Sequence, residues 1–234
     1  MLSLTVVVPA YNEEKRVVPF LKELLDFKRQ NSYFKELIYV NDGSTDRTLE
    51  ILEKYKPGIK IVSYAKNQGK GYAVKTGMLA ATQETIVFLD TDGSTHADQL
   101  PKMVKALEKF PLVFGTRKSK ESEIVHKQPP SRIFASWAFN TMSRVLFSTG
   151  VNDALCGFKG FRKKEGKAIA NKLISRRWIF DVEMAARARR MGYGIGFVPI
   201  RWEHFDDAKM SLGMTSVNMV KDLLKLKLAL MKEK

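Results

Sequence analysis

Val87-Phe88-Leu89-Asp90-Thr91-Asp92-Gly93 is the stretch of sequence that decides the fold of this chain. Residues 86–89 form a short apolar run of branched and aromatic side chains, which predicts a buried β-strand. Asp90 and Asp92 follow it, and two carboxylates this close repel each other unless a cation lies between them. Mg²⁺ and Mn²⁺ prefer such oxygen ligands, so the pattern predicts a metal held by Asp90 and Asp92 together with a diphosphate. The alternative is an ordinary turn.

Three more apolar runs lead into polar loops. They are residues 4–8, followed by Pro9, Tyr11 and Glu13, residues 37–40, followed by Asp42, and residues 59–63, followed by Lys70. Each run predicts a strand that feeds a helix, and such strands pair in parallel. The loops at the carboxyl ends of parallel strands share one edge of the sheet and bind ligands there. The four loops are therefore predicted to form one site.

The rest of the chain continues this alternation. Helices are predicted near 14–30, 47–56, 70–82, 97–109, 132–148, 181–191 and 215–231, and further strands at 112–115 and 195–199. We therefore expect an α/β fold with a mostly parallel central sheet flanked by helices. A chain of 234 residues is long enough for one domain with a large core.

The single cysteine and the hydropathy pattern bear on the compartment. Cys156 permits no intramolecular disulfide, which favours a reducing environment. It is predicted to be a packed small residue rather than a nucleophile, because the sequence offers it no nearby histidine. No signal peptide is recognised, and no apolar run reaches the ~18 residues that a membrane helix needs. We therefore expect a cytoplasmic protein without a transmembrane helix.

Positive charge is concentrated in the second half of the chain. Residues 1–116 contain 16 Lys and Arg against 14 Asp and Glu, whereas residues 117–234 contain 24 against 11. Nucleic acid is not expected as a partner, since the sequence has no zinc finger, RNA-binding motif or recognition helix. An anionic membrane surface is the expected partner, with a membrane protein as a further possibility. The helix at 215–231 combines apolar and lysine side chains, and either contacts that surface or packs on the sheet.

Several motifs together carry a family resemblance. They are Val6–Glu14, Asn41–Thr48, Asn67–Val74, Asp90–Gly93, Asp153–Lys159, Phe180–Glu183 and Pro199–Trp202. The first four resemble the signatures of family 2 glycosyltransferases, which have the Rossmann-like GT-A fold. The last three are similar to polyprenol (dolichyl) phosphate sugar transferases and lean toward the glucosyl rather than the mannosyl branch. The resemblance covers about residues 3–210, and Asn41 departs from it where the family more often has Asp.

The resemblance implies a division of the chain and a reaction. Residues 1–214 would form the GT-A domain, with 1–116 as the nucleotide-sugar half and 117–214 as the acceptor half. Residues 215–234 would form a C-terminal amphipathic, basic helix. The expected reaction is an inverting, metal-dependent transfer of a hexose from UDP-glucose or GDP-mannose to dolichyl or polyprenyl phosphate. The product would be a lipid-linked sugar for glycosylation.

The resemblance also assigns roles to single residues. Asp92 and Asp90 would hold Mg²⁺ or Mn²⁺, Asp42 would bind the base or ribose, and Lys70 would add positive charge near the donor. Pro9, Tyr11 and Glu13 would shape the nucleoside pocket. Arg117 and Arg132 would hold the acceptor phosphate, which is already ionised and needs no general base. Asp153 would orient the acceptor or a loop, and His204 would contact the metal or a phosphate.

Two other functions remain open at this point. The first is transfer to a hydroxyl of a glycan or polar lipid, which requires a base, either Asp153 or Asp181. The second is a non-catalytic partner subunit that binds lipid or a membrane protein. The intact Asp42, Asp90 and Asp92 argue against the second.

Overall fold

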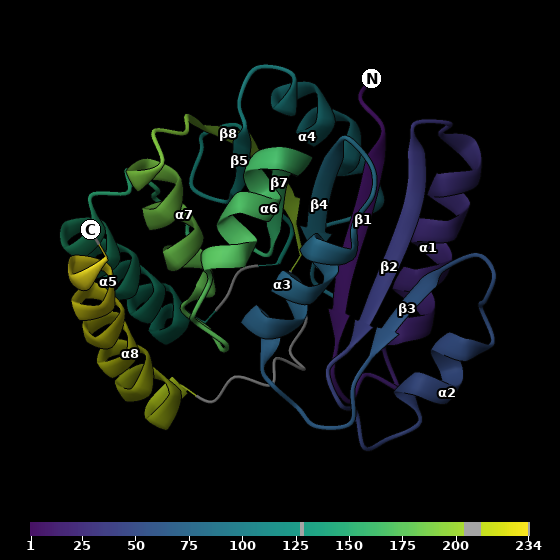
Figure 1. The fold of residues 1–234 in the computed structure, drawn as a ribbon, viewed down its shortest axis with the longest axis horizontal. Helices are drawn as coiled ribbons and strands as arrows, with labels where there is room; N and C mark the ends of the chain where they lie inside the picture. Colours follow the sequence, from purple (N-terminus) through teal and green to yellow (C-terminus); the bar gives the residue numbers. More distant parts are fainter. Residues whose placement is uncertain (127–128, 204–211, 234) are drawn as a thin grey trace.

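A central sheet with helices on both faces organises the molecule, as Figure 1 shows for the computed structural model. The structure describes residues 1–126, 129–203 and 212–233. Seven strands make the sheet: β1 (Leu4–Ala10), β2 (Phe34–Asn41), β3 (Lys60–Ser63), β4 (Thr85–Leu89), β5 (Leu112–Thr116), β7 (Phe158–Arg162) and β8 (Ile195–Pro199). Their order is β3-β2-β1-β4-β7-β5-β8. Only β7 runs antiparallel to its neighbours, so the predicted α/β fold with a mostly parallel sheet is confirmed.

The strands are apolar on both faces because helices cover both faces. In β4, Ile86 and Phe88 join one core, while Val87 and Leu89 join the other. The first core is shared with α3 (Lys70–Ala80), α6 (Lys163–Lys172) and α7 (Phe180–Arg190), and the second with α1 (Val17–Gln30), α2 (Thr48–Glu53) and α4 (Leu100–Leu107). A 3₁₀ turn, Ala97–Gln99, precedes α4. The alternation of side chains along each strand thus fixes which helix layer it contacts.

Two long helices lie side by side at one end of the molecule, α5 (Pro130–Phe147) and α8 (Leu212–Lys232) (Figure 1). Beside the main sheet, a pair of short parallel strands joins β6 (Glu123–Ile124) to β9 (Arg201–Trp202). Within the described ranges, no helix has the length and apolar character needed to cross a bilayer.

The structure differs from the sequence-based expectation in three places. Strand β7 and helix α6 were not predicted, because β7 carries Lys159 and Arg162 and α6 buries only Gly166, Ile169 and Ala170. The loop predicted after residue 116 contains β6. The final helix begins at Leu212, before the predicted boundary, and packs into the same core as α3 and α7.

Candidate active site

The turn after β4 is fixed to the neighbouring strand. The Thr91 hydroxyl, between the two aspartates, donates a hydrogen bond to the carbonyl oxygen of Pro9 at the end of β1. Gly93 adopts a left-handed backbone with φ of +71°, which favours glycine, and the Ser94 amide donates to Asp92 Oδ1 at 3.0 Å. The carboxylates of Asp90 and Asp92 are therefore held at the carboxyl end of β4, where open α/β sheets bind ligands.

Asp90 lies between a lysine and a glycine. Lys70 Nζ is 2.5 Å from Asp90 Oδ1, an oxygen that is buried in the structure. The other oxygen, Oδ2, lies against Gly157, where an added Cβ would come within 2.1 Å of it. Gly157 is therefore required for the position of Asp90, and no side chain fits in its place. Sequence reasoning did not identify this glycine.

The electrostatics of the cluster favour a cation. Burial, together with the negative charge of Asp90, raises the pKa of Asp92. Burial alone would lower the pKa of Lys70, but Asp90, Asp181 and Asp92 outweigh it and raise this pKa. The described part of the chain holds no group of three metal-ligating side chains around this point. Two carboxylates alone fit a Mg²⁺ or Mn²⁺ ion whose other ligands come from a diphosphate and water.

Asp42 is buried and faces the chain itself rather than an open site. Its carboxylate accepts hydrogen bonds from the Tyr64 hydroxyl at 2.8 Å, the Asn67 side chain at 2.9 Å, and the backbone amides of Gln68 and Gly69 at 2.8 and 3.0 Å. These four donors use the acceptor positions of the two oxygens. Asp42 therefore positions the loop that begins α3 and presents Lys70. Its predicted contact with base or ribose stays a prediction.

The loop after β1 carries Tyr11 and Glu13, two of the residues predicted to shape the nucleoside pocket. Tyr11 is exposed at the end of β1. The Glu13 carboxylate accepts hydrogen bonds from Arg16 at 2.8 and 3.0 Å, next to the start of α1. Pro9 acts through its carbonyl oxygen, which holds Thr91. The predicted contribution of these three residues to a nucleoside pocket stays a prediction.

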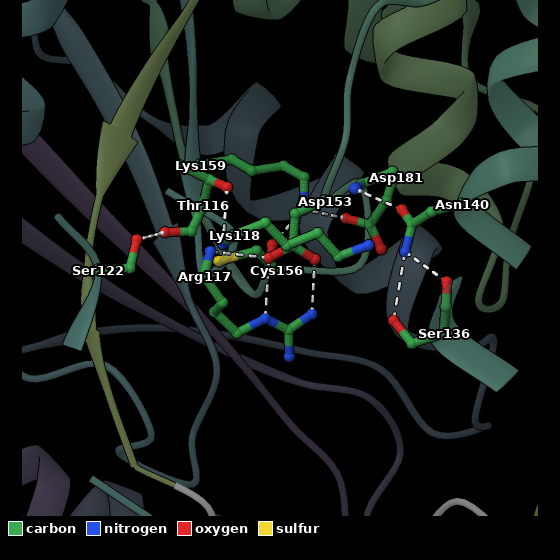
Figure 2. Close-up of polar contacts among 11 residues, drawn as sticks. Thr116, Arg117, Lys118, Ser122, Ser136, Asn140, Asp153, Cys156, Lys159 and Asp181 are labelled. Carbon is green, nitrogen blue, oxygen red and sulfur yellow. Dashed lines mark hydrogen bonds and ion pairs between the residues drawn. The ribbon is translucent and has the colours of Figure 1, made fainter. Parts of the chain in front are cut away.

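Arg117 and Asp153 form a buried ion pair, drawn in Figure 2. Arg117 Nε and Nη2 donate to the two Asp153 oxygens at 2.9 and 2.7 Å, and the Arg117 amide donates to Oδ2 at 2.9 Å. Burial would raise the pKa of Asp153, but the Arg117 charge outweighs it and lowers this pKa. The guanidinium also lies 5.2 Å from the centre of the Trp202 ring. Asp153 therefore orients Arg117 and is poorly placed to accept a proton from a hydroxyl.

Lys159 and Asp181 form a second buried ion pair. Lys159 is fully buried on β7, and its Nζ lies 2.6 Å from Asp181 Oδ1. The same nitrogen lies 5.0 Å from the centre of the Phe88 ring and 5.1 Å from that of the Phe114 ring. Burial raises the pKa of Asp181 in spite of this lysine. Sequence reasoning missed Lys159, although a lysine within an apolar strand signals a buried carboxylate partner.

Three further predicted features have different outcomes. The backbone of Arg132 lies in the first turn of α5, but its side chain is not described, and His204 falls outside the described residues. Cys156 is buried as predicted, and burial raises the pKa of its thiol to about 11. A thiol this protonated and this inaccessible is not a nucleophile at neutral pH.

Comparison with known proteins places this geometry in a family. The model of glycosyl transferase family 2 matches residues 5–166. Dolichyl-phosphate β-glucosyltransferase ALG5A of Trichomonas vaginalis is 36% identical over 95% of this chain and 72% of its own length. The mouse dolichyl-phosphate β-glucosyltransferase is 32% identical over 97% of this chain and 75% of its own length.

A solved structure supports the same fold. Glucosyl-3-phosphoglycerate synthase of Mycobacterium tuberculosis, in complex with Mn²⁺, UDP and glucosyl-3-phosphoglycerate, superposes with a TM-score of 0.72 at 20% identity, covering 96% of this chain and 80% of the other. This likeness confirms the GT-A fold. The match to the family model and the similarity to these relatives make the chain a member of glycosyl transferase family 2, a family of glycosyltransferases.

Proposed function

We propose that this protein transfers glucose from UDP-glucose to a dolichyl or polyprenyl phosphate, with inversion at the anomeric carbon. The observation that carries the proposal is the pair Asp90 and Asp92 at the end of β4, with a lysine at Asp90 and a paired arginine, Arg117, on the acceptor half. The names of the relatives support glucose rather than mannose and dolichyl phosphate as the acceptor. Residues 1–116 would bind the donor and residues 117–214 the acceptor.

The residues of the site divide the work between donor and acceptor. Asp90 and Asp92 would hold Mg²⁺ or Mn²⁺, which, when bound, neutralises charge that develops on the leaving diphosphate. Lys70 adds a second positive charge at this edge, and the Asp42 loop holds the start of α3 in place. Arg117 and Arg132 would bind the acceptor phosphate and direct one of its oxygens to the anomeric carbon.

The acceptor chemistry separates this proposal from its enzymatic alternative. A phosphate monoester needs no base, whereas a hydroxyl does. Both Asp153 oxygens accept from Arg117, and Asp181 is paired with Lys159 at 2.6 Å, so either carboxylate would have to leave a buried cation to act as a base. The two ion pairs therefore favour a phosphate acceptor over a hydroxyl. The presence of Asp90 and Asp92 disfavours a non-catalytic subunit.

A transfer assay tests the proposal. Purified protein with Mn²⁺ should convert UDP-glucose and polyprenyl phosphate into a lipid-linked glucose of β configuration, since a single displacement inverts the α-linked donor. GDP-mannose serves as the matched donor and polyprenol as the matched acceptor without phosphate. Transfer to polyprenol would support the hydroxyl alternative instead, and absence of transfer with every donor would contradict the proposal.

The helix pair α5 and α8 is the part of the protein proposed to meet a membrane. One side of α8 is buried and the other is exposed: Met219, Leu223, Leu226 and Leu230 lie in the core, whereas Val220, Leu224, Leu228 and Met231 are exposed. Lys221, Lys225 and Lys232 flank the exposed stripe. On α5, Phe134 and Trp137 are exposed at 68% and 56%. An apolar stripe edged by lysines suits the interface of an anionic bilayer.

We expect the protein to bind vesicles peripherally, on the cytoplasmic face of a membrane in the cell. Binding to anionic vesicles should fall as salt rises, because exposed charges are screened over about 8 Å at physiological ionic strength. The double variant Leu224→Asn/Leu228→Asn should reduce co-sedimentation at every salt concentration. Phe197→Asn, at an exposed apolar residue of edge strand β8, is the matched control and should leave binding unchanged.

Two results would contradict this membrane proposal. Equal binding to neutral and anionic vesicles would remove the electrostatic contribution. Absence of binding at low salt would point to a separate membrane protein as the anchor. A third result would narrow the proposal. If the double variant binds as the wild type does and binding is lost only when the lysines are replaced, the contact is made by charge alone.

A further inference from the structure

Lys70 contacts the same carboxylate that is proposed to hold the metal. Its ammonium nitrogen lies 2.5 Å from Asp90 Oδ1. In the described part of the chain, this buried oxygen has no other hydrogen-bonding partner. The other oxygen of Asp90 fills the space that a Cβ on Gly157 would need, 2.1 Å from that position, so it is packed against Gly157. A divalent cation at Asp90 would therefore meet the lysine charge at the same oxygen.

The backbone at Lys70 is held in place, whereas its ammonium group can move from one partner to another. Gly69 precedes it with φ of +100°, and any side chain there would strike the carbonyl oxygen of Arg176 at 2.5 Å. The Asp42 carboxylate accepts the amides of Gln68 and Gly69, which fixes the same turn. The Lys70 ammonium lies 5.9 Å from the Trp178 ring, and its side chain remains one-quarter exposed. Only the flexible four-carbon side chain is thus free to move.

We propose that Lys70 occupies the cation position at Asp90 in the nucleotide-free protein and transfers to the diphosphate when the donor binds. This inference rests on the proposed donor site. Two cations compete for one carboxylate, so the metal binds weakly alone. A nucleotide diphosphate offers Lys70 new anionic oxygens, releases Asp90 and so strengthens metal binding. Metal and nucleotide then reinforce each other's binding by the same factor, as linkage requires. Lys70 is a positioning residue that makes the metal site depend on the donor.

Substitution of Lys70 tests this exchange through metal binding rather than activity. Mn²⁺ is titrated into the protein with and without UDP, and free Mn²⁺ is measured by its electron paramagnetic resonance signal. If the lysine holds Asp90 in about nine molecules of ten, Lys70→Met should bind Mn²⁺ alone about tenfold more tightly than the wild type. UDP should tighten Mn²⁺ binding strongly in the wild type and much less in Lys70→Met.

Two matched variants isolate the ion pair from general charge. Lys70→Arg keeps a cation beside Asp90 and should bind Mn²⁺ alone as weakly as the wild type. Lys66→Met removes the same charge from an exposed position on the same loop and should also behave as the wild type. Thermal melts of all variants check the fold. Lys70→Met is expected to fold, because its side chain is partly exposed.

The outcomes separate this inference from the proposed function. Unchanged or weaker Mn²⁺ binding by Lys70→Met, while wild-type protein binds UDP with Mn²⁺, would overturn the exchange and leave the donor site intact. Equal tightening by Lys66→Met would reduce the effect to surface charge and also overturn it. Failure of the wild type to bind Mn²⁺ even with UDP would overturn the proposed donor site, and this inference with it.

Discussion

Asp92→Asn should abolish metal-dependent binding of UDP while leaving the protein folded. The substitution removes one of the two carboxylates at the end of β4 and keeps the shape of the side chain. Of the two carboxylates that the described residues offer a divalent cation here, Asp90 alone would remain, so the metal that binds the diphosphate would be held too weakly. Calorimetry of UDP with and without Mn²⁺ measures the effect. Asp98→Asn, at the exposed aspartate before α4, is the matched control.

The same substitution should not cost stability. Burial and the Asp90 charge raise the pKa of Asp92, so the ionised carboxylate is disfavoured in the folded protein. For a carboxyl group shifted in this direction, the folded state binds more protons than the unfolded state, and stability falls as pH rises through the unfolded and then the folded pKa. Asn carries no charge at any pH. Without metal, the variant should therefore melt at the same temperature as the wild type near pH 4 and higher than it at pH 8.

Failure of this pair of results would be informative. Unchanged metal-dependent UDP affinity would remove the metal from Asp92. A lower melting temperature at pH 8 would mean that the Asp92 carboxylate stabilises the metal-free turn, for example through its hydrogen bond from Ser94.

The gathering of the polar loops after β1, β2 and β4 at one edge of the sheet could be predicted from the sequence, because the signal is local. A short apolar run followed directly by Asp90-Thr91-Asp92 predicts both the strand and the two carboxylates at its end. Parallel pairing then places the ends of β1, β2 and β4 on one edge. The packed state of Cys156 was predicted on a different ground, the absence of a nearby histidine in the sequence.

The partners of each side chain could not be predicted, because they come from segments far apart in the chain. Asp42 accepts hydrogen bonds from the loop 25 to 27 residues later and so fixes the start of α3, a role that its place after β2 does not reveal. Strand β7 enters the sheet antiparallel between β4 and β5 and brings Lys159 beneath Asp181. A Lys-Gly-Phe-Arg sequence has little strand character of its own, and its buried lysine is accounted for by Asp181 and by the carbonyl oxygen of Cys156, to which it donates.

Arg117→Ala should both destabilise the protein and impair the use of the acceptor. Asp153 is 1% exposed, so loss of the arginine leaves a buried carboxylate without its counter-charge. Breaking such a pair costs about 3–5 kcal/mol, which lowers Tm by roughly 6–20 °C for a chain of this size. Because Arg117 lowers the pKa of Asp153, this loss should be full at pH 7 and shrink as pH falls below about 4. The kcat/KM for polyprenyl phosphate should fall by about 30-fold or more.

Removal of the partner as well separates the two effects. In Arg117→Ala/Asp153→Asn the buried charge is gone with its counter-charge, so much of the lost stability should return. Acceptor use should not return, because an asparagine restores no cation for the phosphate. UDP affinity should stay near the wild-type value in both variants. If the double variant instead recovers turnover along with stability, Arg117 acts by holding Asp153 and the loop after β5. The acceptor phosphate would then need another cation, and Arg132 on α5 is the other arginine that the family resemblance assigns to it.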